Sequence, residues 1–279
     1  MNEAGAPAAS PESRSPVTLV TGAAGGIGRA LVQALLREGH DVLASARQLR
    51  DLPALAALAA PGRRLVCVAA DVATSAGRAE IEASLLQSFG GLTGLINNAA
   101  VGTSSIRADY HQRPVTWREI DSDTLHRFLD TNAHAPVALT LQLLPHFTRG
   151  WGRVLNVGTS LAAMLRPGFL AYAMSKAALE SATAILGREL QGTGITVNLL
   201  NPGGPIDTPM TRRDAGPQSR TLIPADVMAA PVCWLVSQAS GAITAQRITA
   251  TRWQGPQHAE AFAPAGWPQL ANDSTWNPV

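Results

Sequence analysis

Residues 17–28 read VTLVTGAAGGIG. The run Val17–Val20 is short, apolar and rich in β-branched residues, which predicts a buried strand. A cluster of glycines follows, and apolar residues then recur at helical spacing from Ile27 to Leu35, which predicts a helix. Glycine permits a tight turn and close approach of backbone amides to a ligand, and the helix adds free N–H groups and its positive dipole end. This order of strand, glycine turn and helix favours a phosphate-binding loop over a glycine-rich turn without a ligand.

The rest of the chain continues the alternation of strands and helices. Further strands are predicted at 41–46, 65–68, 95–96, 154–157, 195–200 and 246–250, and helices at 75–89, 121–149, 172–191 and 225–238. Strands that are apolar almost throughout and separated by helices are typical of a parallel sheet buried on both faces. The sequence therefore predicts a single α/β domain with a doubly wound (Rossmann-type) parallel β-sheet of about seven strands and helices on both faces. Its ligand site should lie beyond the carboxyl ends of the strands.

Three segments depart from this alternation. Residues 1–16 are rich in Ala, Pro and Ser without an apolar core, which predicts a disordered tail rather than a signal peptide. Residues 101–120 form a long polar loop. Residues 252–279 are rich in Pro and Trp, and the sequence pattern assigns no helix or strand to them. The expected organisation is a tail at 1–16, a folded domain at 17–251 and a carboxyl-terminal extension at 252–279.

The composition limits the classes of partner and compartment. Of 279 residues, 46% are hydrophobic and 15% charged, and the net charge is +2, which argues against nucleic acid or an anionic membrane as a general partner. Cys67 and Cys233 lie far apart in apolar stretches, so we expect two buried thiols in a reducing compartment and neither a disulfide nor a metal site. No uncharged apolar run approaches membrane-spanning length. We expect a soluble, cytoplasmic protein.

The motifs between about residues 17 and 250 resemble those of the short-chain dehydrogenase/reductase family. The glycine loop matches its Thr-Gly-x-x-x-Gly-x-Gly pattern, residues 97–100 look like its Asn-Asn-Ala-Gly motif with Ala100 in place of glycine, and Pro202-Gly203 follows the sixth strand as in the family. The resemblance implies that Asp71 lies near the adenine, that Pro202-Gly203 borders the nicotinamide, and that Thr208 binds the carboxamide. The implied dinucleotide-binding residues are Gly22, Ala24, Gly26, Ile27, Gly28, Asp71, Val72, Asn98, Ala99, Pro202, Gly203, Ile206 and Thr208.

The end of the second strand bears on the choice of dinucleotide. It reads LASAR at residues 43–47 and lacks the carboxylate that would bind a ribose 2′-hydroxyl. Arg47 can pair with a 2′-phosphate and Ser45 can donate to it, unless Arg47 is simply solvated. Many relatives that prefer NADP also carry a basic residue in the glycine loop, where this chain has Gly25. NADP(H) is favoured, and NAD(H) stays open.

Tyr172 and Lys176 are the candidate catalytic pair. Residues four apart lie on one face of a helix, so the lysine ammonium can stabilise a phenolate. A tyrosine ordinarily titrates at about pH 10, and nearby cations, here Lys176 and an oxidised nicotinamide, would lower that value. The alternative is an amphipathic helix with a surface lysine. The nucleotide signature upstream favours catalysis, in which case both residues also contact the cofactor.

Two further candidates follow from the resemblance. The family places a serine that polarises the carbonyl thirteen residues before the tyrosine, and counting back from Tyr172 gives Thr159, with Ser160 beside it as the alternative. Asn132 matches the family's helix asparagine, whose implied role is to hold a water next to Lys176. It could equally be a buried asparagine that bonds to the backbone.

The favoured function is hydride transfer between NADP(H) and a carbonyl or secondary alcohol, with Tyr172 as general acid and base. A non-catalytic NADP(H)-binding sensor or scaffold is the alternative. A sugar epimerase or dehydratase shares the Tyr/Lys pair, but such relatives usually carry a larger carboxyl-terminal domain. We expect a small, fairly hydrophobic carbonyl substrate, no metal, and a homodimer or homotetramer formed through the helices at 121–149 and 172–191.

Overall fold

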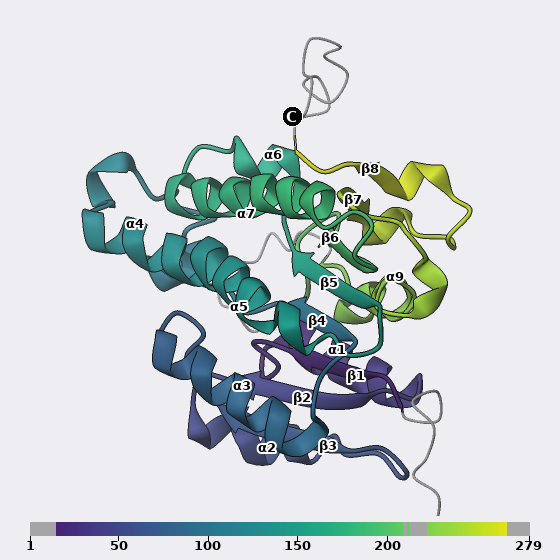
Figure 1. Cartoon of the computed structure of the whole chain (residues 1–279). Coiled ribbons are helices and arrows are strands. Elements are labelled where there is room, and N and C mark those ends of the chain that lie inside the picture. The colour runs from purple at the N-terminus through teal and green to yellow at the C-terminus, as the bar shows by residue number, and fades with distance from the viewer. Residues whose placement is uncertain (1–14, 209–210, 212–221, 267–279) are drawn as a thin grey trace, which may run out of the picture.

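The computed structural model describes residues 15–208, 211 and 222–266. At its centre lies an eight-stranded sheet with the order β3-β2-β1-β4-β5-β6-β7-β8 (Figure 1). The strands are β1 (Val17–Val20), β2 (Asp41–Ala46), β3 (Leu65–Ala69), β4 (Gly94–Asn97), β5 (Gly152–Val157), β6 (Ile195–Asn201), β7 (Gln246–Thr249) and β8 (Phe262–Pro264). The first seven are parallel, which confirms the predicted doubly wound sheet, and β8 adds an antiparallel strand that the sequence did not predict.

Helices cover both faces of the sheet. On one face lie α3 (Ser75–Phe89), α5 (Ala135–Leu143) and α7 (Leu170–Glu189), and on the other α1 (Gly26–Arg37), α2 (Leu52–Ala56) and α9 (Ala229–Leu235). Neighbouring residues of a strand point to opposite faces. Leu19 therefore packs in the core on the side of α3, α5 and α7, and Val20 packs in the core on the side of α1, α2 and α9. A strand that serves two cores must be apolar throughout, which explains the uninterrupted hydrophobic runs.

The predicted helix at 121–149 is built in segments. It consists of α4 (Ser122–Leu129), a π-helical turn (Asp130–His134), α5, and a 3₁₀ turn (Leu144–His146). Asp121 is the N-cap of α4, and its carboxylate accepts a hydrogen bond from the Thr124 amide at 2.8 Å. A π turn inserts one extra residue and rotates the side chains that follow it, and such turns occur often at functional sites.

The strand order places the functional loops at one edge of the sheet. The chain runs outward from β1 through β2 to β3 and then returns to the other side of β1 with β4. The carboxyl ends of β1, β4, β5 and β6 therefore lie next to one another at the point where the order reverses, which is where ligands bind in open α/β sheets. The glycine loop follows β1, and the other motifs follow the neighbouring strands.

The carboxyl-terminal extension joins the domain, contrary to the expectation that it lacks regular structure. Its strand β8 pairs with β7, and Trp253 and Phe262 pack on α9. The ring centres of Trp234 and Trp253 lie 5.3 Å apart, and those of Trp253 and Phe262 lie 5.9 Å apart. This burial of large rings fixes the described part of the extension to the sheet.

A buried ion pair ties the same region to α7. The Arg247 guanidinium on β7 pairs with the Glu180 carboxylate, and Arg247 Nε donates to Glu180 Oε1 at 2.9 Å. The Gly266 amide donates to the same oxygen at 3.0 Å. Both side chains are nearly fully buried, so each charge depends on the other for compensation.

Ala245 lies in the turn before β7. It is the one non-glycine residue with positive φ (54°) in the part of the chain that the structure describes. Its backbone is held on both sides, because its amide donates to Val197 O and its carbonyl accepts from the Ala265 amide. The close packing of Gly187 on α7 against this turn leaves no room for a side chain at residue 187.

Both cysteines are free thiols, but each is only half-buried, so the expectation of two buried thiols is wrong in degree. Burial still raises the pKa of Cys233 to about 12 and that of Cys67 above its ordinary value. None of the helices described by the structure is both long and apolar enough to cross a membrane. Across residues 15–208, 211 and 222–266, His, Cys, Asp and Glu side chains form no group of three suited to a metal.

Candidate active site

The glycine loop after β1 turns tightly. Gly22 has φ +61°, and a Cβ there would lie 2.7 Å from Ala99 Cα, so only glycine fits. A Cβ at Gly28 would overlap the carbonyl oxygen of Gly22, and one at Gly26 would lie 2.8 Å from Thr208 Cγ2. Gly22 and Gly26 thus let the loop pack against the segments that follow β4 and β6, and Gly28 lets the loop close on itself. Ala24 and Ile27 pack partly buried on the core beneath.

The loop after β4 is bonded to the glycine loop. The Asn98 side-chain amide donates to the carbonyl oxygens of Thr21 at 3.0 Å and Gly22 at 3.1 Å. Thr21 Oγ1 accepts from the amides of Asn98 and Ala99. Asn97 instead points into the sheet, where its amide donates to Asn156 Oδ1 at 2.8 Å. The second asparagine of the motif therefore shapes the site, and the first holds the core.

The site offers the donors that a dinucleotide requires. Gly25 is the N-cap of α1 and has no side chain to cap the helix, so within the described residues the first amides of the helix stay available to a diphosphate. Ser45 Oγ is buried and finds no hydrogen-bond partner among the described residues, and Arg47 lies exposed two residues further on. Val72, next to Asp71, is buried in the core just beyond the end of β3. These residues fit a dinucleotide with its diphosphate on α1.

The nicotinamide end would lie along the segment after β6. Gly203 has φ +92°, and a Cβ at this position would overlap the Thr251 hydroxyl. Pro202 precedes it and accepts a hydrogen bond from the Thr251 amide at 3.2 Å. Ile206 is buried and forms a bridge with Ile223, and Thr208 contacts Gly26 across the site. The structure thus brings together cofactor candidates from the loops after β1, β4 and β6.

Tyr172 and Thr159 are hydrogen-bonded, whereas Ser160 points elsewhere. Burial raises the pKa of the Tyr172 phenol above its ordinary value, and the hydrogen bond with Thr159 acts in the opposite direction. Ser160 is the N-cap of the short helix α6 (Leu161–Met164), and its hydroxyl accepts from the Ala163 amide at 3.2 Å. The two neighbouring hydroxyls therefore have different surroundings.

Lys176 lies one turn after Tyr172 on the same side of α7. Its side chain is 3% exposed, and Nζ donates to the carbonyl oxygen of Val157 at 2.8 Å. The ammonium nitrogen is 6.0 Å from the centre of the Tyr172 ring. Burial lowers the pKa of Lys176 to about 8, so the group stays mostly cationic at neutral pH. Its positive charge is thus buried close to the phenol.

Asn132 lies in the π turn and links two parts of the site. Its side-chain amide donates to Val101 O at 2.9 Å and to Ser175 Oγ at 3.0 Å, and its carbonyl oxygen accepts from the Val101 amide at 2.8 Å. Ser175 Oγ in turn donates to Tyr172 O at 2.7 Å. These bonds connect the loop after β4 to α7. They agree with the backbone-bonding interpretation of Asn132, and its role toward a water stays a prediction.

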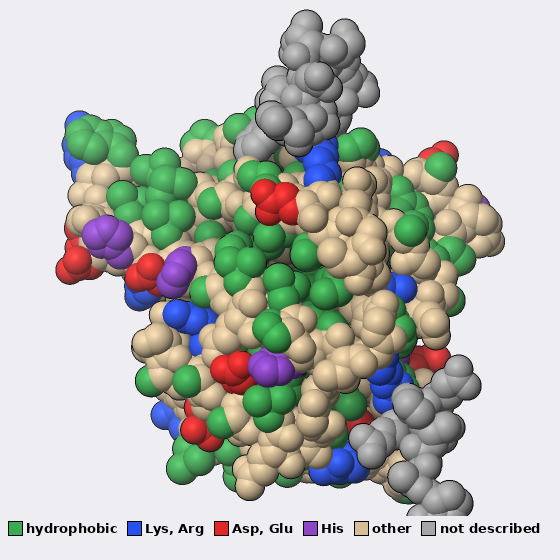
Figure 2. Space-filling model, viewed as in Figure 1, with side chains coloured by type: hydrophobic (Ala, Val, Ile, Leu, Met, Phe, Trp, Pro, Cys, Tyr) green, Lys and Arg blue, Asp and Glu red, His purple; other side chains and the backbone are tan. Residues whose placement is uncertain are grey.

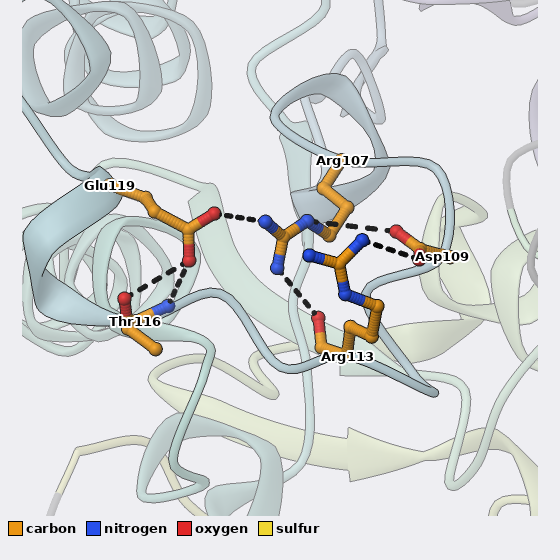
Figure 3. A network of polar contacts seen from close by, with 5 residues as sticks. All are labelled: Arg107, Asp109, Arg113, Thr116 and Glu119. Carbon is orange, nitrogen blue, oxygen red and sulfur yellow. Dashed lines mark hydrogen bonds and ion pairs between the residues drawn. The ribbon is translucent and has the colours of Figure 1, made fainter.

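The sequence did not predict a polar network inside the loop at 101–120 (Figure 3). Arg107 pairs with Glu119 and with Asp109, and its guanidinium donates to Arg113 O at 3.2 Å. Glu119 also accepts from the amide and the hydroxyl of Thr116. The capping box of Thr116 and Glu119 carries a recognisable Thr-x-x-Glu spacing, whereas nothing in the sequence pairs Arg107 with Glu119. The network gives this long loop a defined shape beside the site.

An α/β fold with a glycine loop at the sheet's switch point and a Tyr/Lys pair beside it defines a dinucleotide-dependent oxidoreductase. Residues 16–218 match the family model of the short chain dehydrogenases, and the protein belongs to this family. Its members are NAD(P)-dependent oxidoreductases that act on CH–OH groups, and this chain is one of them.

Individual relatives agree with this assignment. The chain is 31% identical over 209 residues to 3-oxoacyl-(acyl-carrier-protein) reductase FabG of Pseudomonas aeruginosa, covering 74% of this chain and 80% of the relative. It is 32% identical over 200 residues to the short-chain reductase protein NovJ of Streptomyces niveus, covering 71% and 72%. Among solved structures, YwfH, an NADPH dependent reductase involved in bacilysin biosynthesis, shares the fold with a TM-score of 0.75 at 22% identity, covering 85% of this chain and 97% of that one.

Proposed function

We propose that the protein transfers a hydride between NADP(H) and a carbonyl or secondary alcohol, with Tyr172 as the general acid and base. The observation that carries this proposal is the group formed by Tyr172, Thr159 and Lys176. The Thr159 hydroxyl is bonded to the phenol, and the buried ammonium of Lys176 lies near the ring. All three lie at the edge of the sheet where the glycine loop begins, which is where the fold binds ligands.

The chain's own residues supply the proton chemistry. The bound dinucleotide would deliver or accept the hydride. During reduction, charge develops on the carbonyl oxygen, and the hydroxyls of Thr159 and Tyr172 can both donate hydrogen bonds to it. The phenol of Tyr172 gives up its proton to that oxygen, and in the reverse direction the phenolate takes a proton from the alcohol. Lys176 stabilises the phenolate through its charge, and we propose that Asn132 holds a water on the path that restores the proton.

We infer a preference for NADP(H) from the end of β2. Arg47 is exposed there, Ser45 Oγ is buried without a partner among the described residues, and no carboxylate stands in this stretch. A guanidinium matches a 2′-phosphate in charge and geometry, whereas a carboxylate would repel it. Gly25 lacks the basic side chain that many NADP-preferring relatives carry in the loop, so Arg47 would be the principal contact.

A non-catalytic sensor that binds NADP(H) is the competing function, and Tyr172→Phe separates the two. The variant should bind NADPH nearly as well as the wild type, because the ring stays in place. Its turnover, measured by NADPH oxidation with a panel of ketones, should fall by a few orders of magnitude because the general acid is lost. A near-normal kcat on a true substrate would disprove the role of Tyr172. Cofactor binding without turnover of any ketone by the wild type would favour the sensor.

We also propose a homodimer or a dihedral homotetramer built on the outer face of α5 and α7. Leu141 of α5 and Ile185 of α7 are each 50% exposed there, and Met174 and Ala178 of α7 are also exposed. Figure 2 shows hydrophobic side chains on the face of the molecule formed by these helices. A self-complementary apolar face favours symmetric association. Ala173 and Ala184 of α7 face the core and do not contribute to this surface.

Light scattering at micromolar concentration tests the assembly. A mass of two or four times 29.1 kDa is expected. Ile185→Asp should reduce it toward the monomer, because a charge cannot be buried in the apolar contact. A wild-type mass near that of one chain would contradict the proposal.

A further inference from the structure

A row of aromatic side chains leads from the loop at 101–120 to the catalytic helix. The rings of Tyr110 and Phe169 meet edge to face, with centres 5.7 Å apart and planes at 68°. Phe169 and Tyr172 meet in the same way at 6.2 Å and 71°. His111 lies against Tyr110 with ring centres 4.1 Å apart. We call Tyr110, His111 and Phe169 the aromatic wall.

The positions of these rings are fixed by their surroundings. Phe169 stands at the start of α7, with the Arg166 guanidinium 5.1 Å from its ring centre. Gly168 has φ +88°, and a Cβ there would lie 2.8 Å from Pro114 Cβ, so the two loops are in close contact. The ion pairs of Arg107 shape the loop that carries Tyr110 (Figure 3). The wall is therefore formed before a substrate arrives.

The wall also retains surface for a ligand. Tyr110, His111 and Phe169 are each only partly buried, unlike the large side chains of the two cores. Phe169 is the N-cap of α7, and its ring contacts that of Tyr172 in the first turn of the helix. A carbonyl compound whose oxygen reaches the Tyr172 hydroxyl consequently has its nearest substituent beside Phe169.

From this arrangement we propose that the aromatic wall selects substrates whose carbonyl group carries a planar aromatic ring, that is, aryl ketones and the corresponding aryl carbinols. This inference rests on the proposed function, because it takes Tyr172 as the group that meets the carbonyl oxygen. Aromatic rings attract one another edge to face and in offset stacks, beyond the effect of buried area. Rings already held in position bind a flat partner without first losing conformational freedom.

The test compares acetophenone with cyclohexyl methyl ketone, which share the carbonyl and the carbon skeleton but differ in the planarity of the ring. With the full-length protein and NADPH, we expect kcat/KM for acetophenone to be about tenfold higher, with the difference mainly in KM. Phe169→Leu and Tyr110→Leu keep an apolar side chain without the ring. Each should bring the ratio to within about threefold, because acetophenone loses more than the saturated ketone does.

Two matched variants control for effects of the loop itself. Tyr110→Phe retains the ring and should retain the preference. Trp117→Leu removes a ring from the same loop that is 69% exposed and contacts Arg118, and it should leave the ratio unchanged. Equal rates with the two ketones in the wild type, or an equal loss for both ketones in Phe169→Leu, would overturn the proposal.

Binding of both ketones to the protein with NADP⁺, measured by ligand-observed NMR, separates this inference from the proposed function. Turnover of both ketones without discrimination would leave the function intact and refute the aromatic wall. Tighter binding of acetophenone that disappears in Phe169→Leu, without turnover of either ketone, would support the wall and count against Tyr172 as proton donor to such carbonyls. Weaker binding of acetophenone than of the saturated ketone would refute the wall on its own.

Discussion

Thr159→Val and Ser160→Ala each remove one of two neighbouring hydroxyls. The first should lower activity at nearly unchanged stability, and the second should lower stability at nearly unchanged activity. Valine keeps the shape of threonine, so the first change removes the hydrogen bond to Tyr172 with little change in packing. A single donor to a developing oxyanion is typically worth about 10²- to 10³-fold in kcat, or about 3–4 kcal/mol. Ser160→Ala removes only the cap of α6, which costs about 1 kcal/mol of stability and should lower kcat less than threefold.

The assay is kcat/KM for a ketone with NADPH, combined with the pH profile of alcohol oxidation and the thermal unfolding midpoint. The bond from Thr159 lowers the pKa of Tyr172, so its removal should raise that pKa. Oxidation needs the phenolate, and its profile in Thr159→Val should therefore shift to higher pH. The unfolding midpoint should fall in Ser160→Ala and stay nearly constant in Thr159→Val. A larger loss of kcat/KM in Ser160→Ala would refute this reasoning and transfer the polarising role to Ser160.

Three other perturbations test the cofactor, the buried lysine and the buried ion pair. Arg47→Ala should weaken the binding of NADPH by about 1.5–3 kcal/mol and leave the binding of NADH nearly unchanged in fluorescence titrations, because only NADPH carries the 2′-phosphate. An equal loss of affinity for both dinucleotides would contradict the preference for NADP(H). Burial lowers the pKa of Lys176 to about 8, so between pH 8 and pH 10 the unfolded chain binds more protons and stability should rise with pH. In urea titrations, the free energy of unfolding should rise between pH 8 and pH 10 by about 2 kcal/mol more in the wild type than in Lys176→Met. The same pH dependence of stability in both proteins would contradict this prediction. Glu180→Ala should lower the free energy of unfolding by about 3–5 kcal/mol, because Arg247 keeps a buried charge without its partner. The same measurement on Glu189→Ala, an exposed carboxylate of the same helix, should change little.

The local patterns of the sequence were sufficient for most of the fold. Strand β1, the glycine turn and α1 are adjacent in the chain, and their chemistry depends on nearest neighbours, so residues 17–37 could be interpreted without tertiary information. Uninterrupted apolar strands separated by helices predicted the parallel sheet for the same reason. Strand β8 escaped prediction because a three-residue edge strand has no periodicity of its own and exists only through pairing with β7.

The candidate site likewise contains residues whose pairing follows from local spacing and residues whose pairing does not. Tyr172 and Lys176 belong to one helix, whose 3.6-residue period determines that they share a side, so their pairing could be predicted from spacing. Thr159 and Ser160 are adjacent, and spacing cannot tell which hydroxyl faces the phenol. That depends on the start of α6, which takes Ser160 as its cap and leaves Thr159 bonded to Tyr172.

Contacts between distant parts of the chain were decided by the tertiary structure alone. Tyr110 reaches Phe169 because the loops after β4 and β5 emerge at neighbouring points of one sheet edge. Arg107 pairs with Glu119, and Asn132 bonds to Val101, because the long connection between β4 and β5 folds back on itself. The sequence by itself determined that this chain carries a dinucleotide loop and a Tyr/Lys helix, since both are local. It could not determine the wall beside Tyr172, since ring-to-ring contacts depend on where packing places two loops that are far apart along the chain.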